Sequence, residues 1–223
     1  MDVILIAGLW LKTRVWGNVV RELEELGHRP IPVVLPGTDD GDTSATLDDQ
    51  CSAVLEAVDA ADNPIVVGHS AAATLAWLAA DRRPDAISRV IMVGGFPASS
   101  ESPYANFFPV VDGVMPFPGW EPFEGADAAD LNADLRKRLA GGAVAVPGSV
   151  ATAIVSYESP ERFAVPVTLV CPEFSPEDAV AWISAGELPE LSLVEDITFA
   201  DIDSGHWPMA TKPRELAELL VNS

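Results

Sequence analysis

The sequence predicts an α/β fold in which a mostly parallel sheet of about six strands is covered by helices on both faces. Three observations carry this prediction. Short runs rich in Val and Ile alternate with segments of helical periodicity, beginning with a run over residues 3–7. The alternation breaks once, over residues 96–164, and then resumes. A chain of 223 residues, 48% of them hydrophobic, can bury one sizeable core, so we expect one domain with an inserted cap.

The start of the chain has the pattern of a strand, a helix and a second strand. The buried strand over 3–7 precedes a helix over 15–26 and a strand over 31–35. Parallel strands joined through a helix imply a right-handed crossover. A polar loop then leads to a helix that runs through Ala60, and Thr43 or Ser44 can cap its N-terminus.

The same alternation continues to the C-terminus. Because ligands of such sheets bind at the carboxyl ends of the parallel strands, the loops that follow the strands are the places to look for a site. The remaining expected elements are strands over 65–67, 90–93, 166–171 and 197–202, and helices over 71–80 and 177–185 and from about 213 onwards.

The segment 96–164 interrupts this pattern with many prolines and aromatic residues and a helical piece near 128–139. Nearly seventy residues are far more than an ordinary connection between two core strands, so the segment should have structure of its own. We assign residues 1–95 and 165–223 to the core domain and residues 96–164 to an inserted cap or lid. Its aromatic content suits a lid over an apolar cleft.

Composition excludes several classes of function. A net charge of −21 argues against nucleic-acid or membrane partners, because phosphate backbones and anionic lipids attract positive charge. The sequence has two cysteines, no CxxC pattern and no secretory leader, so we expect a cytoplasmic protein with unpaired thiols. We expect it to act as a monomer or homodimer on a small-molecule substrate. Without an HExxH, paired-cysteine or GxGxxG pattern, no metal or organic cofactor is expected.

The strand over 65–67 meets the helix over 71–80 at Ser70, with almost no room for a loop. Small residues at Gly68, Ala71 and Ala72 are what such a sharp turn requires. Ser70 would then lie beside the first N–H groups of a helix, which can stabilise an oxyanion. Serine is also a good helix N-cap, so the same pattern fits a purely structural role.

A serine hydroxyl needs a positioned base, and histidine is well matched to that task. The chain has three histidines. His28 precedes a strand and belongs to the opposite end of the sheet, while the imidazole of His69 should pack against the strands. His206 alone lies in a loop directly after a strand, at the same edge as Ser70, and is therefore the candidate base.

These segments resemble the α/β-hydrolase superfamily. The matching stretches are Gly-His-Ser-Ala-Ala at 68–72, Ser-Gly-His-Trp-Pro at 204–208, Ala-Gly-Leu at 7–9 and the passage over 27–37. The resemblance is greatest to small capped, esterase-like members such as the plant methylesterase and hydroxynitrile lyase group. It implies that Ser70 is the nucleophile and His206 the general base, and that the backbone N–H groups of Leu9 and Ala71 form the oxyanion hole.

Two positions depart from the family pattern, and the acid must be chosen. Ala72 replaces the usual second glycine, and Ala7 stands where the family often has histidine. The family usually supplies an aspartate after the strand that ends here at 170–171, where Glu173 is the nearest carboxylate. Asp178 and Glu101 are the alternatives. Trp10 and Trp207 flank the expected site and could line its pocket.

The sequence therefore favours a serine hydrolase that cleaves a small, mainly apolar carboxylic ester, lactone or thioester through an acyl-enzyme. Two alternatives stay open, since a fold does not determine the reaction. The same triad could perform lyase chemistry of the hydroxynitrile lyase kind, or the chain could be a non-catalytic protein that binds a ligand beneath its cap.

Overall fold

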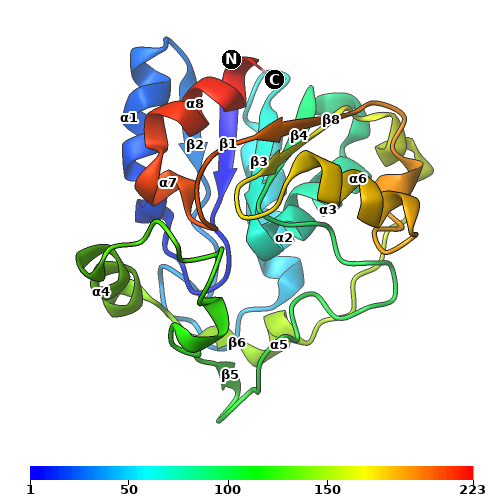
Figure 1. Cartoon of the computed structure of the whole chain (residues 1–223). Coiled ribbons are helices and arrows are strands. Elements are labelled where there is room, and N and C mark those ends of the chain that lie inside the picture. The colour runs from blue at the N-terminus through cyan, green and yellow to red at the C-terminus, as the bar shows by residue number, and fades with distance from the viewer. Residues whose placement is uncertain (223) are drawn as a thin grey trace.

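A computed structural model describes residues 1–222 of the protein. Its six core strands form one sheet in the order β2-β1-β3-β4-β7-β8, and each neighbouring pair is parallel (Figure 1). The predicted parallel α/β sheet is confirmed. The strands are β1 (Asp2–Ile6), β2 (Arg29–Pro32), β3 (Ile65–His69), β4 (Arg89–Val93), β7 (Val167–Cys171) and β8 (Ile197–Asp201).

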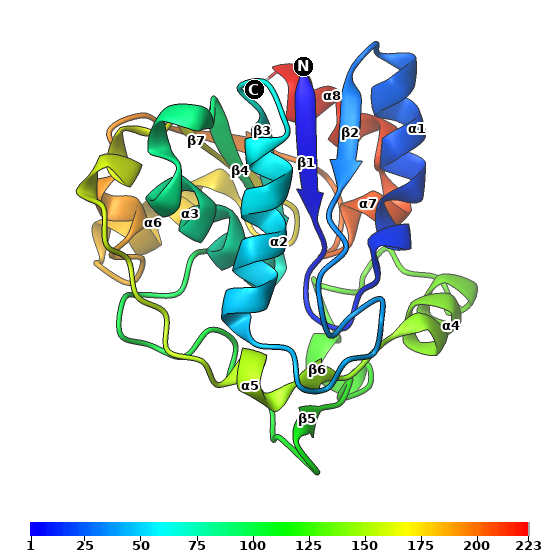
Figure 2. The same ribbon diagram turned by 180° about the vertical axis from the view of Figure 1, so that it is seen from behind.

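Helices cover both faces of the sheet because the side chains of the central strands alternate between two apolar clusters. In β1, Val3 and Leu5 pack in one cluster and Ile4 and Ile6 in the other, and all four are fully buried. Figures 1 and 2 show α1 and α8 on one face and α2 and α3 on the other. The bounds are α1 (Gly17–Glu25), α2 (Leu47–Asp59), α3 (Ala73–Arg82), α6 (Pro176–Ser184), α7 (Pro208–Thr211) and α8 (Pro213–Asn222). None of the helices within residues 1–222 is long and apolar enough to cross a membrane.

Two expected helix starts were wrong. Thr46, and neither Thr43 nor Ser44, caps α2, because its side chain accepts from the N–H of Asp49 in a reciprocal capping box. Ser44 instead donates to Asp42 at 2.7 Å and belongs to the preceding turn. The cap helix begins at residue 133 rather than near 128, since Asn132 accepts from the N–H of Leu135 at 2.9 Å.

The segment between β4 and β7 lies over the carboxyl ends of the strands. In Figure 1 the β1 arrow points towards it, and its short elements, in green, lie below the sheet. It holds the expected helix, an antiparallel pair of two-residue strands and a second, four-residue helix; the sequence pattern did not separate the strand pair and the second helix from loop. These elements are β5 (Val114–Met115), α4 (Ala133–Gly142), β6 (Val146–Pro147) and α5 (Gly148–Ala151).

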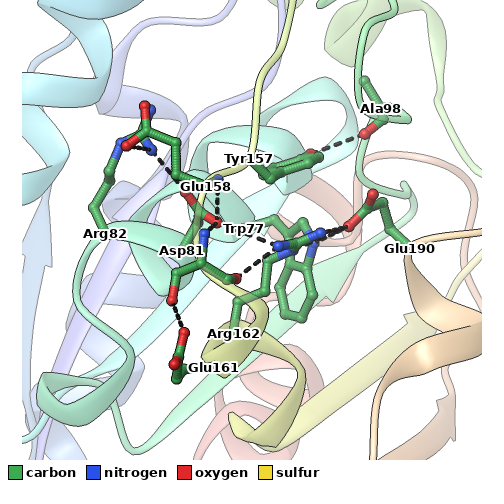
Figure 3. A network of polar contacts seen from close by, with 10 residues as sticks. Trp77, Asp81, Arg82, Ala98, Tyr157, Glu158, Glu161, Arg162 and Glu190 are labelled. Carbon is green, nitrogen blue, oxygen red and sulfur yellow. Dashed lines mark hydrogen bonds and ion pairs between the residues drawn. The ribbon is translucent and has the colours of Figure 1, made fainter.

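A buried polar network attaches the end of this segment to α3 (Figure 3). Asp81, on α3, accepts from the backbone N–H groups of residues 158–159 at 2.8–3.0 Å and from Arg162 at 3.4 Å. Arg162 also donates to Glu190 at 2.9 Å, and Glu190 accepts from the Trp77 indole at 3.0 Å. Two carboxylates thus share one buried guanidinium. Asp81 also pairs with the partly exposed Arg82 at 2.8 Å, so Glu190 is the carboxylate that would be left as an uncompensated buried charge without Arg162.

We therefore expect Arg162→Met to lower the free energy of unfolding by about 3–5 kcal/mol, because Glu190 would stay buried without its cation and Asp81 would keep only the partly exposed Arg82. The matched control is Arg83→Gln, which breaks a surface pair with Asp59 whose side chains are 41% and 51% exposed. That change should cost less than about 1 kcal/mol. Urea denaturation of the three proteins measures both values, and equal losses for the two variants would contradict the assignment.

Candidate active site

The turn between β3 and α3 holds Ser70 in a conformation that side-chain-bearing residues rarely adopt. Ser70 has φ 56° and begins a single 3-10 turn over Ser70–Ala72 that leads directly into α3. Two glycines make room for it. A Cβ on Gly68 would lie 2.3 Å from the Ala72 carbonyl oxygen, and one on Gly95 would lie 2.3 Å from that of Ser70. This crowding projects the Ser70 side chain beyond the edge of the sheet, and the strain of about 1–3 kcal/mol is typical of functional sites.

Three side chains from separate loops meet at this edge. His206, in the loop after β8, has its Nε2 at 2.9 Å from the Ser70 Oγ, and its Nδ1 at 2.6 Å from Oε1 of Glu173, in the loop after β7. The His206 and Glu173 side chains are each 14% exposed. An ionised carboxylate can only accept, so Nδ1 carries the proton and Nε2 can accept from the serine hydroxyl.

The two alternative acids lie elsewhere. Asp178 accepts from the Ser175 hydroxyl at 2.8 Å and completes the capping box of α6. Glu101 is exposed, and its backbone pairs with Val155 in the segment that follows β4. Of the three candidate carboxylates, Glu173 alone contacts the His206 ring.

Gly94 allows the histidine and the glutamate to approach each other at the end of β4. Its φ is +58°, and a Cβ there would lie 3.2 Å from Oε2 of Glu173 and 3.3 Å from Nδ1 of His206. Oε2 of Glu173 is buried and accepts no hydrogen bond within residues 1–222. The charge of this carboxylate is therefore directed mainly at the imidazole.

His69 positions His206 by binding the backbone of that residue. This role was missed in the sequence analysis. The His69 imidazole is buried as expected, and Nε2 donates to the His206 carbonyl oxygen at 2.8 Å. Burial, together with the neighbouring His206, lowers the pKa of His69 to about 3. The ring is therefore neutral near pH 7. Its position directly before the elbow serine was the only sequence signal of this role.

The loop after β1 contacts the serine from the other side. A Cβ on Gly8 would lie 3.1 Å from the Cβ of Ser70, so Leu9 follows a residue in contact with the serine. Ala71 is the residue after Ser70 and belongs to the turn that opens the helix. Leu9 and Ala71, whose amides the resemblance implied for the oxyanion hole, thus belong to the two segments that border Ser70.

Aromatic side chains of the cap segment pack over the site. Phe123 lies between the two predicted pocket residues, with ring centroids 6.0 Å from Trp10 and 5.6 Å from Trp207. Phe117 and Trp120 complete the group. Together with Trp10, Trp207 and Leu9 they line a cavity of about 20 Å³. The aromatic composition of residues 96–164 predicted an apolar lid, but the pattern did not identify which rings would reach the site.

No group of His, Cys, Asp and Glu side chains in the described part of the chain is arranged to hold a metal ion. The polar groups at this edge include the serine, the two histidines and the glutamate. Their arrangement can deprotonate a hydroxyl and stabilise the imidazolium that results.

Residues 3–219 match the model of the alpha/beta hydrolase family. The chain belongs to this family. Its fold resembles an extracellular alpha/beta-hydrolase from a Paenibacillus species, described as homologous to tobacco salicylic acid binding protein 2, with a TM-score of 0.80 and 17% identity over 99% of this chain and 98% of that one. No curated protein matches the sequence.

Two further solved structures show the same hydrolase fold. A methylesterase from Arabidopsis has a TM-score of 0.75 and 14% identity, covering 99% of this chain and 98% of that one. A pyrethroid hydrolase from Sphingobium faniae has a TM-score of 0.72 and 17% identity, covering 100% and 96%. The suspected superfamily is therefore confirmed for this α/β-hydrolase.

The buried neutral His69 predicts a specific acid sensitivity of the fold. Between pH about 3 and 6.5 the unfolded state binds a proton at this histidine and the native state does not, so stability falls as the pH falls through that window. From pH 7.5 to 5.0 this contribution is about 2 kcal/mol. Urea denaturation measures how far the free energy of unfolding falls between pH 7.5 and 5.0. For His69→Asn this fall should be smaller than for wild type by that amount, whatever the stability of the variant at pH 7.5. Equal losses in the two proteins would contradict the assignment.

Proposed function

We propose that this α/β-hydrolase cleaves a small, mainly apolar carboxylic ester, lactone or thioester through an acyl-enzyme on Ser70. The observation that carries the proposal is the continuous chain of hydrogen bonds from Ser70 through His206 to Glu173. The names of the methylesterase and the pyrethroid hydrolase that share the fold are in keeping with an ester substrate.

The first half of the reaction follows from the positions of the polar groups. Nε2 of His206 accepts the hydroxyl proton while the Ser70 oxygen attacks the carbonyl carbon. The backbone N–H groups of Leu9 and Ala71 donate to the oxyanion of the tetrahedral intermediate, and the N-terminal end of α3 adds its positive dipole. The intermediate collapses when Nε2 returns the proton to the leaving alcohol.

The second half repeats these steps with water. His206 takes a proton from a water molecule, whose oxygen attacks the acyl carbon, and the acid leaves as Ser70 regains its proton. Glu173 serves both halves by keeping the proton on Nδ1 and by stabilising the imidazolium. His69 supports the same ring from its backbone side, through the His206 carbonyl oxygen.

The apolar character of the substrate follows from the walls of the site. Trp10, Phe123 and Trp207 form an apolar group next to the His206 ring, which favours an apolar acyl or alcohol group. In this proposal residues 1–95 and 165–223 are the catalytic core, and residues 96–164 are the cap that sets specificity. The unpaired, buried thiols of Cys51 and Cys171 support a cytoplasmic setting.

Ser70→Ala should abolish hydrolysis of p-nitrophenyl butyrate, because no other group in the site is placed to form the acyl-enzyme. A fluorophosphonate probe should label the wild-type protein at Ser70 and leave the variant unlabelled, as mass spectrometry of the tryptic peptides would show. Unchanged turnover in the variant would refute the proposal. An unreactive wild-type serine would favour the non-catalytic alternative.

Glu173→Gln should reduce kcat by about 10³- to 10⁴-fold, because an amide can hold the imidazole in the wrong tautomer and cannot stabilise its charged form. Asp178→Asn is the matched control. It removes a carboxylate from the same loop region but alters only a helix cap, so activity should stay within a few-fold of wild type. If the two variants lost activity equally, Glu173 would not be the acid.

A further inference from the structure

A hollow of about 350 Å³ opens beside the site, between the start of α1, α4 and α7. These three segments lie side by side in Figures 1 and 2. Apolar side chains line the hollow, among them Leu11, Leu139 and Met209, and three cationic side chains lie on its walls. We call it the cationic groove and define those cations as Lys12, Arg14 and Arg138.

The charge of this groove is opposite to that of the protein. The chain has 34 acidic and 13 basic residues, yet none of the residues that line the groove is acidic. A neighbouring hollow that shares Arg14 and Arg138 adds Lys137 and again contains no carboxylate. On the far side of Arg138, Asp134 is the one acidic residue among those that line the adjoining hollow. Four cations therefore lie together on a strongly acidic protein.

These four cations are not used to hold the fold together. Arginines elsewhere form ion pairs, such as Arg29 with Asp2 and Arg214 with Glu218. Within residues 1–222, the side chains of the groove cations and of Lys137 form no ion pair. The Arg14 guanidinium lies against Gly142, where a Cβ would come within 2.4 Å of Nη2. Their charges are thus available to a ligand.

The groove adjoins the proposed catalytic centre. Leu11 and Leu139 line both the groove and the small aromatic cavity beside Leu9, so the two spaces are neighbours. Lys12 and Arg14 follow Leu9 by three and five residues, which limits their Cα separations from Leu9 to about 11 Å and about 18 Å. An aliphatic chain together with the long arginine side chain can span the larger distance.

We propose that the cationic groove binds the carboxylate end of the substrate, so that the enzyme acts on aliphatic esters whose far end carries a negative charge. The proposal rests on the function proposed above and specifies its substrate class. The apolar lining would cover the methylene chain, while the guanidinium groups of Arg14 and Arg138 bind the carboxylate. A monoanion suits the site because the net charge of −21 repels a more highly charged ligand. The size of the hollow fits a small molecule rather than a protein surface.

Two esters with the same acyl chain length test the proposal. Mono-p-nitrophenyl suberate ends in a carboxylate, and p-nitrophenyl octanoate is its neutral counterpart. In the double variant Arg14→Gln/Arg138→Gln, kcat/KM should fall about tenfold for the suberate and change little for the octanoate. The matched control, Arg83→Gln/Arg214→Gln, changes the net charge equally and should leave the ratio of the two values at its wild-type level.

Ionic strength offers a second readout of the same contact. Salt should reduce the wild-type preference for the suberate over the octanoate and have little effect on that ratio in the groove variant. The proposal would be overturned if the ratio of kcat/KM for the suberate to kcat/KM for the octanoate were the same in wild type and in the groove variant. It would also be overturned if the control variant changed this ratio as much as the groove variant does.

Binding to Ser70→Ala separates this proposal from the proposed reaction. Calorimetry should show that Ser70→Ala binds monomethyl suberate, a monoanion, about tenfold more tightly than the triple variant with both groove substitutions. If wild type hydrolyses neither ester but this difference is present, the proposed reaction fails and the anion site stands. If the octanoate is hydrolysed but the binding of monomethyl suberate does not depend on the arginines, the anion site fails and the esterase stands.

Discussion

The close contact between the β3–α3 turn and the end of β4 is the constraint on which the site depends. A Cβ at residue 95 would clash with the Ser70 carbonyl oxygen, and a Cβ at residue 68 would clash with the Ala72 carbonyl oxygen. Both positions must be glycine for the strand and the helix to come this close. The contact forces the positive φ of Ser70, and that conformation points the hydroxyl at the loops after β7 and β8. Serine, helix N-terminus and histidine are therefore brought together by backbone packing rather than by their own attraction.

The loops that complete the site are held by contacts of their own, so the serine does not have to order them. His69 donates to the backbone of His206, and the N–H of His206 donates to the Asp127 carbonyl of the cap segment at 2.8 Å. The histidine loop is thus fixed both to the core strand and to the cap. Farther away, the network around Asp81 and Arg162 anchors the end of the same cap segment on α3. Between these two attachments the segment is also bonded to the core, because the Val144 N–H donates to the Trp10 carbonyl at 3.0 Å and the Ser149 hydroxyl to the Ala45 carbonyl at 2.6 Å.

The distribution of charge over the surface bears on how a charged ligand would approach the protein. A uniform charge of −21 would repel every anion, but the cationic groove creates a local reversal next to the proposed catalytic centre. Clefts lined by one sign of charge focus the field and raise the local concentration of a complementary ligand. The surrounding carboxylates would repel a negatively charged group elsewhere on the surface, so the groove would be its favourable binding place.

The sequence by itself determined the parallel α/β sheet, the elbow at Ser70 and the choice of His206, because all three follow from local periodicity and from which strand end a loop continues. Boundaries near polar loops were less certain, as Thr46 shows, since several adjacent residues could cap the same helix. Only the tertiary structure decided that Glu173 rather than Asp178 contacts the imidazole, which rings of the cap cover the site, and that distant cations share one groove. Those contacts join residues far apart in the chain, and the direction of a side chain in a loop depends on packing that no local pattern encodes.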